Sequence, residues 1–259
     1  MAIQFSREEL LHEALVLPMR SFVCLPDTQI IDRPGFLQVI TPSLKQGGLN
    51  QVIFSVLKDE ETEEIIDQTI AEYQRHGIRF RWSVLPGSRP EDLGERLARR
   101  GLRPVEVRAM YRETRPAHSD NSPDVHVEEV HEGIVDTFTE AICAGWGMDP
   151  TPLYAFHRDL LKRPARDSRL FLGYYCGKPA GGACSTSFSR SMYLIGAAIA
   201  PEFRGKGIYR ALVEARLNAA SESGISLATT QAQARSSAPI LERLGFETLC
   251  TFEVYGNRE

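Results

Sequence analysis

A basic turn that contains two glycines, Arg204-Gly205-Lys206-Gly207, stands where the sequence changes from strand-like to helix-like spacing. The first N–H groups of a helix have no intrahelical acceptor, and the helix dipole leaves partial positive charge at that end. Gly205 and Gly207 let the backbone approach an anion closely. Arg204, Lys206 and Arg210 add formal charge around the same point. The sequence therefore predicts a binding site for a phosphate group at this turn.

The segments on both sides of the turn have the spacing needed to position it. Residues 192–200 form a continuous apolar run of strand length, which is typical of a strand covered on both faces. One face of the following helix is apolar, with side chains at helical spacing: Ile208, Leu212, Ala215 and Ala219. Strand, turn and helix start together are the arrangement that a phosphate site requires.

The pattern Arg204-x-x-Gly207, with Pro201 upstream, resembles the acyl-CoA pyrophosphate loop of the GCN5-related N-acetyltransferase (GNAT) family. The family pattern is Gln/Arg-x-x-Gly-x-Gly/Ala, and Tyr209 departs from it where glycine or alanine is usual. The resemblance covers about residues 125–257 and implies acetyl-CoA as co-substrate. It assigns the diphosphate to the turn and the first residues of the helix, namely Arg204, Gly205, Lys206, Gly207, Ile208, Tyr209 and Arg210.

The resemblance also gives a role to the strand before the turn, since in this family the backbone of the central strand holds the pantetheine arm. The corresponding residues are Ala198, Ile199 and Ala200. A backbone N–H of this strand would also face the thioester carbonyl and stabilise the oxyanion. Gly196 fits a strand that a ligand approaches closely, and it fits equally well a sheet packed tightly against a helix.

The groups that would transfer protons are harder to identify. The attacking amine must be neutral, and the leaving thiolate needs a proton or a local positive field. Many family members supply this proton from a tyrosine four residues before the Gly-Phe of the last helix, but here that position is Leu241. Ser237 is an alternative acid, although a serine before a helix more often serves as its N-cap. His157 is an alternative base acting through water, or simply a packed histidine.

The amine acceptor is expected to meet the loop of residues 145–152 and the short helix after it. In this interpretation Trp146 and Tyr154 form an aromatic wall, and Asp149 attracts a cationic amine. Trp146 fits equally well a role as an anchor of the loop in the core.

Composition restricts the class of protein. The chain has 259 residues, 42% of them hydrophobic, a net charge of −4 and a pI near 5.9, which argues against a general nucleic-acid or membrane-surface binder. The five cysteines show no metal-ligand spacing, so no metal is predicted and reduced thiols in a cytoplasmic protein are expected. The longest apolar run is about half of the ~20 residues that a membrane helix needs.

Helix and strand signals repeat along the chain. Ser6-x-x-Glu9 and Ser88-x-x-Glu91 are capping-box patterns that predict helix starts. A meander of three strands is expected, with the central strand as the third, and a strand, a short helix and a last strand are expected after its helix. Residues 114–124 are rich in proline and small polar residues and have no apolar period, which indicates a linker.

The two halves repeat one pattern. Leu97 precedes Gly101 as Leu241 precedes Gly245, and a strand at 52–57 leads to a helix as the strand at 192–200 does. The acidic connection 58–64 replaces the basic turn, however, and its carboxylates would repel a diphosphate. Generic similarity between αβ units is the alternative explanation.

We therefore predict an α/β chain of two tandem GNAT-like domains, each with a mixed, mostly antiparallel sheet flanked by helices. Residues 1–117 are the degenerate copy without the phosphate loop, 118–124 the linker and 125–259 the acyl-CoA-binding domain. The predicted enzyme is an N-acetyltransferase that transfers an acetyl or other acyl group to the primary amine of a small molecule, peptide or protein. One alternative is a catalytically weak acyl-CoA sensor or regulatory module; another is a phosphate-binding protein unrelated to CoA.

Overall fold

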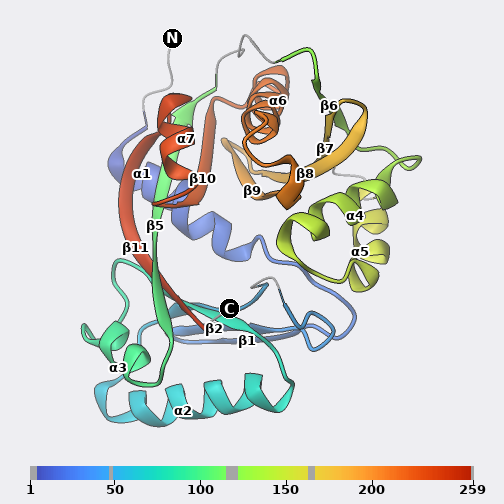
Figure 1. Cartoon of the computed structure of the whole chain (residues 1–259). Helices are drawn as coiled ribbons and strands as arrows, with labels where there is room; N and C mark the ends of the chain where they lie inside the picture. Colours follow the sequence, from blue (N-terminus) through green and yellow to red (C-terminus); the bar gives the residue numbers. More distant parts are fainter. Residues whose placement is uncertain (1–4, 47–48, 115–121, 163–166, 258–259) are drawn as a thin grey trace. The chain divides into compact units, whose positions relative to one another are not determined.

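The computed structural model describes residues 5–46, 49–114, 122–162 and 167–257 (Figure 1). These residues form two compact units, each assembled from separate segments of the chain. Unit 1 contains Met1–Ser21, Ala109–Gln231 and Ile240–Leu249. Unit 2 contains Phe22–Arg108, Ala232–Pro239 and Cys250–Glu259. Residues 118–121 of the predicted linker lie outside the described residues.

The elements follow the predicted order, with bounds that move by a few residues. In the first half they are α1 (Arg7–Leu11), the π-helix η1 (His12–Val16), the 3-10 helix η2 (Leu17–Arg20), β1 (Gln29–Arg33), β2 (Phe36–Ile40), β3 (Asn50–Ser55), α2 (Asp59–Arg75), β4 (Phe80–Val84), α3 (Leu93–Arg99) and β5 (Arg103–Glu113). In the second half they are β6 (Val125–Glu129), α4 (Val135–Trp146), η3 (Thr151–Leu153), α5 (Tyr154–Lys162), β7 (Ser168–Tyr175), β8 (Lys178–Ser187), β9 (Ser191–Ile199), η4 (Pro201–Phe203), α6 (Ile208–Glu222), β10 (Leu227–Gln233), α7 (Ala238–Arg243) and β11 (Glu247–Gly256).

The two units do not coincide with the predicted segments 1–117 and 125–259. The reason is that each half of the chain contributes part of its final strand to the other unit. Residues 109–113 of β5 lie in unit 1, and residues 250–256 of β11 lie in unit 2. The N-terminal helices also belong to unit 1.

The sheet of unit 1 has the strand order β5-β10-β9-β8-β7-β6. Strands β7, β8 and β9 form the predicted antiparallel meander, and β10 is parallel to β9. Helices α4 and α6 cover opposite faces of this sheet. Two neighbouring residues of β8 show this, since successive strand residues point to opposite sides. Gly182 faces Phe138 of α4, whereas the next residue, Ala183, packs in a cluster with Ile208 and Leu212 of α6.

The N-terminal helices are fixed to the start of β9. Ser6 and Glu9 form the predicted capping box, with the Ser6 N–H donating to Glu9 and the Glu9 N–H to the Ser6 hydroxyl. The carboxylate of Glu13 is buried and accepts a hydrogen bond from the Ser191 hydroxyl. A buried carboxylate needs such a donor, so this contact orders the N-terminal segment in unit 1.

Unit 2 has the strand order β1-β2-β3-β4-β11. Strand β11 pairs antiparallel with β4, with Tyr255 opposite Trp82. Both side chains are buried in one core with Leu93 and Leu97 of α3. The ring of Tyr255 lies so close to Gly94 that a Cβ there would be 2.4 Å from the phenol oxygen. The last strand of the chain therefore completes this core.

The acidic connection predicted at 58–64 is the first part of a helix, since α2 begins at Asp59. Its carboxylates form ion pairs with two arginines of the α3 region. Arg96 contacts Asp59 and Glu63, and Arg100 contacts Glu63 and Asp67, the last pair at 2.5 Å. Acidic side chains also favour the positive end of a helix dipole. This sequence thus starts and packs a helix.

Strands β3 and β4 are paired in parallel over only three positions, from Asn50–Phe80 to Val52–Trp82. Beyond that point the chain itself lies beside β3. The Arg89 N–H donates to the Ser55 carbonyl at 3.2 Å, and the Leu57 N–H donates to the Arg89 carbonyl at 3.0 Å. These bonds satisfy backbone groups that an open strand end would leave to water or a ligand.

The predicted helix start at Ser88 is wrong. The Ser88 hydroxyl accepts a hydrogen bond from the Leu85 N–H at 3.0 Å, which closes a turn, and α3 begins only at Leu93. Serine offers the same acceptor to a turn as to a helix start, so the local pattern did not distinguish the two.

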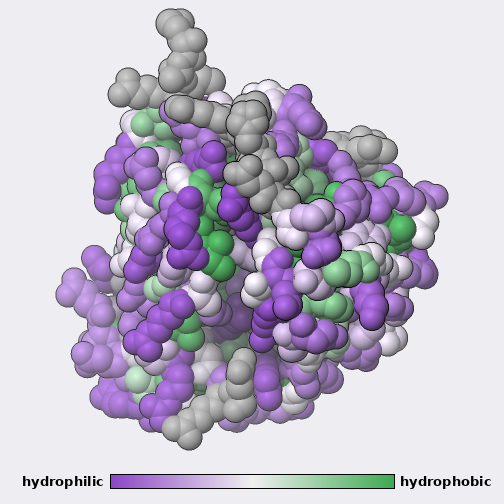
Figure 2. Space-filling model, turned by 45° about the horizontal axis from the view of Figure 1, so that its top comes forward, coloured by the Kyte–Doolittle hydropathy of each residue, from purple (hydrophilic) through white to green (hydrophobic). Residues whose placement is uncertain are grey.

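The face shown in Figure 2 is largely hydrophilic, and its apolar side chains form small separate patches. No helix among the described residues is long and apolar enough to cross a membrane.

The exchange of the last strand predicts that Tyr255→Ala destabilises unit 2. Loss of a buried aromatic ring should lower the free energy of unfolding by about 3–5 kcal/mol. Tyr255→Phe is the matched control and should cost only about 1 kcal/mol, because it removes a single hydrogen bond to Glu253. Urea unfolding followed by the fluorescence of Trp82, in a Trp146→Phe background, measures both. Equal midpoints for Tyr255→Ala and the control would contradict the role of β11 in this core.

Candidate functional site

Strand β9 carries a β-bulge. Cys184 of β8 pairs with Ile195 and Gly182 pairs with Ala198, so three steps along β9 match two steps along β8. Gly196 inside the bulge has a φ of +58°, in the left-handed region that favours glycine. A bulge interrupts the ladder and bends its strand, so β9 changes direction here.

Strand β10 pairs with β9 only before the bulge. The register joins Leu227–Thr229 to Ser191–Tyr193, and the Thr230 hydroxyl then donates to the Leu194 carbonyl at 2.9 Å. In the described part of the chain the β9–β10 pairing ends there. The later residues of β9, which include Ala198, therefore face a break in the sheet. A break of this kind leaves strand backbone for a ligand to bind.

Ala200 differs from the other two strand residues predicted to hold a ligand. Its N–H donates to the Ala180 carbonyl at 2.9 Å, and its carbonyl accepts from the Phe203 N–H at 2.9 Å. Its backbone groups thus have partners within the protein, and the ligand contact predicted for this residue stays a prediction. The contacts predicted for Ala198 and Ile199 stay predictions.

The end of α4 lies directly against the bulge. A Cβ at Gly145 would lie 2.7 Å from the Ala198 side chain and 2.9 Å from the Ile199 nitrogen. The ring of Trp146 lies over Gly196, since a Cβ there would be 3.3 Å from its Cζ2 atom. Gly145 allows this approach, and Trp146 is half-buried beside the bulge.

The basic turn has the backbone that the sequence predicted. Gly205 and Gly207 have φ values of +76° and +85°, and α6 begins at Ile208 with no side-chain cap. Space is open where a Cβ at either glycine would point. The first N–H groups of α6 therefore have no side-chain capping oxygen from Gly207, as an anion site requires.

A pocket of about 470 Å³ lies at this turn, inside unit 1. It is lined by the end of β9, the turn, the start of α6 and part of α7: Ile199, Phe203, Arg204, Gly205, Gly207, Ile208, Tyr209, Arg210, Ile240, Arg243 and Leu244. Most of the residues predicted to hold a diphosphate are thus brought together. Arg243 is a pocket residue that the sequence analysis missed, because only the packing of α7 brings it there.

The cationic side chains at the turn have different partners. Arg204 donates to the carbonyls of Ile199, at 3.2 Å, and Gly145, at 3.3 Å, which ties β9 to α4. Arg210 forms an ion pair with the buried carboxylate of Glu214 at 2.8 Å. Lys206 is outside the pocket lining, and its amino group lies 5.8 Å from the ring centre of Tyr175.

Tyr209, which stands where the resembled pattern has a small residue, is half-buried and lines the pocket. It therefore occupies space beside the turn that glycine or alanine would leave open. The phenol is a candidate contact for a ligand in the pocket.

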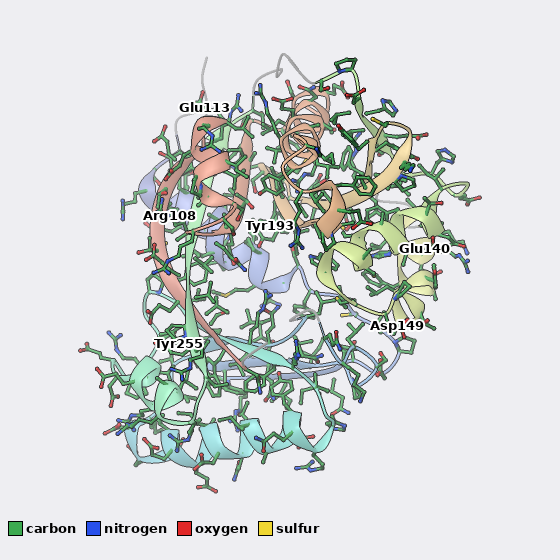
Figure 3. All side chains as sticks on the ribbon, viewed as in Figure 1. Arg108, Glu113, Glu140, Asp149, Tyr193 and Tyr255 are labelled. Carbon is green, nitrogen blue, oxygen red and sulfur yellow. The ribbon has the colours of Figure 1, made fainter. Side chains whose placement is uncertain are left out.

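The residues predicted for the acceptor lie around the α4–α5 connection. Asp149 accepts hydrogen bonds from the Thr151 N–H and hydroxyl, and these bonds lower the pKa of its carboxyl. The Tyr154 hydroxyl donates to Glu140 at 3.1 Å, and burial raises the pKa of this phenol. Figure 3 shows Glu140 and Asp149 beside helices α4 and α5. Glu140 had no sequence signal of its own.

The predicted base, His157, lies on α5 and is buried. His157 is 3% exposed, bonds Thr139 at 2.9 Å, and burial lowers its pKa from 6.5 to about 4. This favours a packing role over that of a base. Leu241 is buried in the core, where it offers no proton. Ser237 lies in the turn before α7, in a segment assigned to unit 2, and stays a prediction.

Comparison with known proteins identifies the domain. Residues 127–246 match the model of the acetyltransferase (GNAT) family, so this part of the chain is a GNAT domain. Among solved structures, a GCN5-related N-acetyltransferase from Kribbella flavida is similar with a TM-score of 0.65 and 13% identity over 100% of this chain and 97% of that one. No curated protein matches the sequence.

Two further structures have the same fold. A GCN5-related N-acetyltransferase from Sphaerobacter thermophilus has a TM-score of 0.59 and 14% identity, and covers 86% of this chain and 80% of its own. A tandem GNAT protein from the clavulanic acid biosynthesis pathway has a TM-score of 0.55 and 12% identity, and covers 95% and 92%. At these identities the likeness concerns the fold. A mixed sheet flanked by helices is the fold predicted from the sequence.

The burial of His157 predicts a pH dependence of stability. The unfolded state binds a proton below pH 6.5, whereas the folded state binds it only near pH 4, so stability is lost as the pH falls between these values. Linkage gives a loss of about 2 kcal/mol between pH 7 and pH 5 from this one group. Urea unfolding at both pH values should show a loss smaller by about that amount in His157→Gln. An equal loss in the two proteins would show that His157 titrates normally when folded.

Proposed function

We propose that unit 1 binds acetyl-CoA and transfers its acetyl group to the primary amine of a small molecule, peptide or protein. A GNAT domain supports acyl transfer from acetyl-CoA in general. The observation that carries the proposal for this chain is that four features follow one another from the bulge of β9 to the start of α6. They are the break in the sheet beside β9, the glycine-containing basic turn, the uncapped start of α6 and the pocket beside the turn.

The pocket fits the charged part of the coenzyme. A diphosphate needs hydrogen-bond donors and positive charge, and the first N–H groups of α6 supply donors that no capping oxygen occupies. Arg210 and Arg243 line the pocket and contribute cations. Gly207 leaves open space where a side chain would point. These features support the assignment of the turn to the diphosphate.

The break beside β9 fits the pantetheine arm, which is the uncharged part of the coenzyme. An extended amide-containing arm binds by adding to the edge of a strand, and β9 beyond Leu194 has such an edge. Acetyl-CoA supplies the activated acyl group. The backbone near Ala198 would orient the thioester, and an N–H there would stabilise the oxyanion. Trp146 over the bulge would exclude water from one side.

Two of these features are replaced in the described residues of unit 2. The place beside β3 is taken by Arg89, whose backbone forms two hydrogen bonds there. The acidic start of α2 replaces the basic turn, and its carboxylates pair with Arg96 and Arg100. This supports the proposal that the chain has two related units of which one binds acetyl-CoA.

A second candidate function is a catalytically weak acyl-CoA sensor. The observation that favours it is the position of the usual tyrosine, which is filled by the buried Leu241. The buried His157 gives no evident base either. Both candidate functions require acetyl-CoA binding, and only an enzyme releases thiol in the presence of an amine.

Binding should depend on Gly207. Calorimetric titration of the whole chain with acetyl-CoA should give one site per chain, and Gly207→Glu should abolish binding because a carboxylate then meets the diphosphate. Gly207→Ala is the matched control: it carries the strain of the positive φ, about 1 kcal/mol, without the charge. It should weaken binding by about tenfold or less and keep the same melting temperature as Gly207→Glu. Full affinity in Gly207→Glu would remove the diphosphate from this turn.

Turnover separates the two candidates. We expect thiol release from acetyl-CoA with at least one amine in a screen of polyamines, aminoglycosides, amino acids and peptide N-termini. Release should vanish in Gly207→Glu, which controls for spontaneous aminolysis. Tight binding of acetyl-CoA with no release across the screen would favour the sensor.

A further inference from the structure

Arg216 is a buried cation on α6. Its side chain is 2% exposed, and its guanidinium donates to the carbonyls of Leu212, at 2.9 Å, and Cys184, at 3.1 Å. An arginine stays protonated in proteins even when burial lowers its pKa, as it does here. The protein therefore holds a positive charge inside unit 1.

This charge has no carboxylate partner among the described residues. The titratable side chains that act on it are Tyr209 and Cys184, and burial raises the pKa of the Cys184 thiol to about 12, so that thiol is neutral. The neighbouring Glu214 pairs with Arg210 instead. An unpaired buried charge destabilises the folded state, and its two carbonyl bonds offset only part of that cost. Among the residues that the structure describes, Arg216 is thus a buried cation with no paired carboxylate.

The guanidinium of Arg216 lies next to the bulge of β9. Cys184, whose carbonyl accepts from Arg216, is the residue that pairs with Ile195 immediately before the bulge. Neighbouring strands are about 4.8 Å apart, so the guanidinium lies roughly one strand away from the break in the sheet. Helix α6 starts at the pocket and packs against β7, β8 and β9, which brings Arg216 beside Cys184 of β8.

We infer that Arg216 supplies the positive field that stabilises the thiolate leaving from acetyl-CoA, in place of the proton donor absent at Leu241. The inference rests on the proposed function. The amine nitrogen forms a bond to the acyl carbon, the C–S bond breaks and its electron pair stays on sulfur. The ammonium proton goes to solvent, and the thiolate later takes a proton from water. Arg216 does not touch these atoms and acts through its charge.

The effect is measurable without an acceptor, because a field that stabilises the thiolate also acidifies the thiol of bound CoA. Coulomb's law at an effective dielectric of about 20 and a separation of roughly 10 Å gives about a tenfold change in acidity. With calorimetry setting saturation, the ultraviolet absorbance of the CoA thiolate is followed against pH. The bound thiol should titrate about one pH unit lower in the wild type than in Arg216→Met.

Matched variants separate charge from packing. Arg169→Met removes an arginine that also donates to α6, to the Ala219 carbonyl at 3.2 Å, but that is paired with Glu129. It should leave the thiol titration unchanged, and Arg216→Lys, which keeps the charge, should stay near the wild type. Arg216→Gln keeps a donor for the carbonyls and should behave as Arg216→Met, and it replaces that variant if methionine prevents folding.

The experiment separates failure of the inference about Arg216 from failure of the proposed function. If CoA binds to the wild type and its thiol titrates at the same pH in the wild type and in a folded neutral variant of Arg216, the inference is overturned and the proposed function stands. If calorimetry shows that the wild type does not bind CoA, the proposed function fails first.

Discussion

One extra residue in β9 sets the geometry on which the rest of unit 1 depends. Because three steps of β9 match two of β8, the strand bends away from β10 just after the Thr230–Leu194 hydrogen bond. Three residues around the break accommodate the bend of β9. Gly145 lets α4 touch the strand backbone, Gly196 takes the left-handed conformation, and Arg204 ties the strand end to α4.

The two units treat the same break in opposite ways. In each, a central strand pairs in parallel with the next strand over three positions and then separates from it. Unit 2 fills the place with its own backbone at Arg89, whereas unit 1 continues into a glycine turn and a pocket. A sheet break that the chain satisfies is a structural element, and one that it leaves open is a candidate site. This contrast supports the proposal that only unit 1 binds acetyl-CoA.

The sequence predicted local features well and tertiary ones less well. The glycine turn, the helix after it and the meander follow from periodicity and from glycine positions, which are properties of short segments. Ser6 was correctly assigned as a cap and Ser88 was not, because the same hydroxyl can serve a turn. The hydrogen bonds that occupy Ala200, the arrival of Arg243 at the pocket and the exchange of final strands depend on contacts between distant segments. Nothing in one sequence records those pairings.

The exchanged strands also constrain how the chain can fold as it is synthesised. The core of unit 2 contains Trp82, made early, and Tyr255, made more than 170 residues later. Until the late strand emerges, β4 presents an unpaired edge and an incomplete core, and such edges pair readily with other chains. Contacts so far apart in sequence also form slowly. A gene divided at the predicted linker would therefore yield two fragments, each without a strand segment that its unit contains.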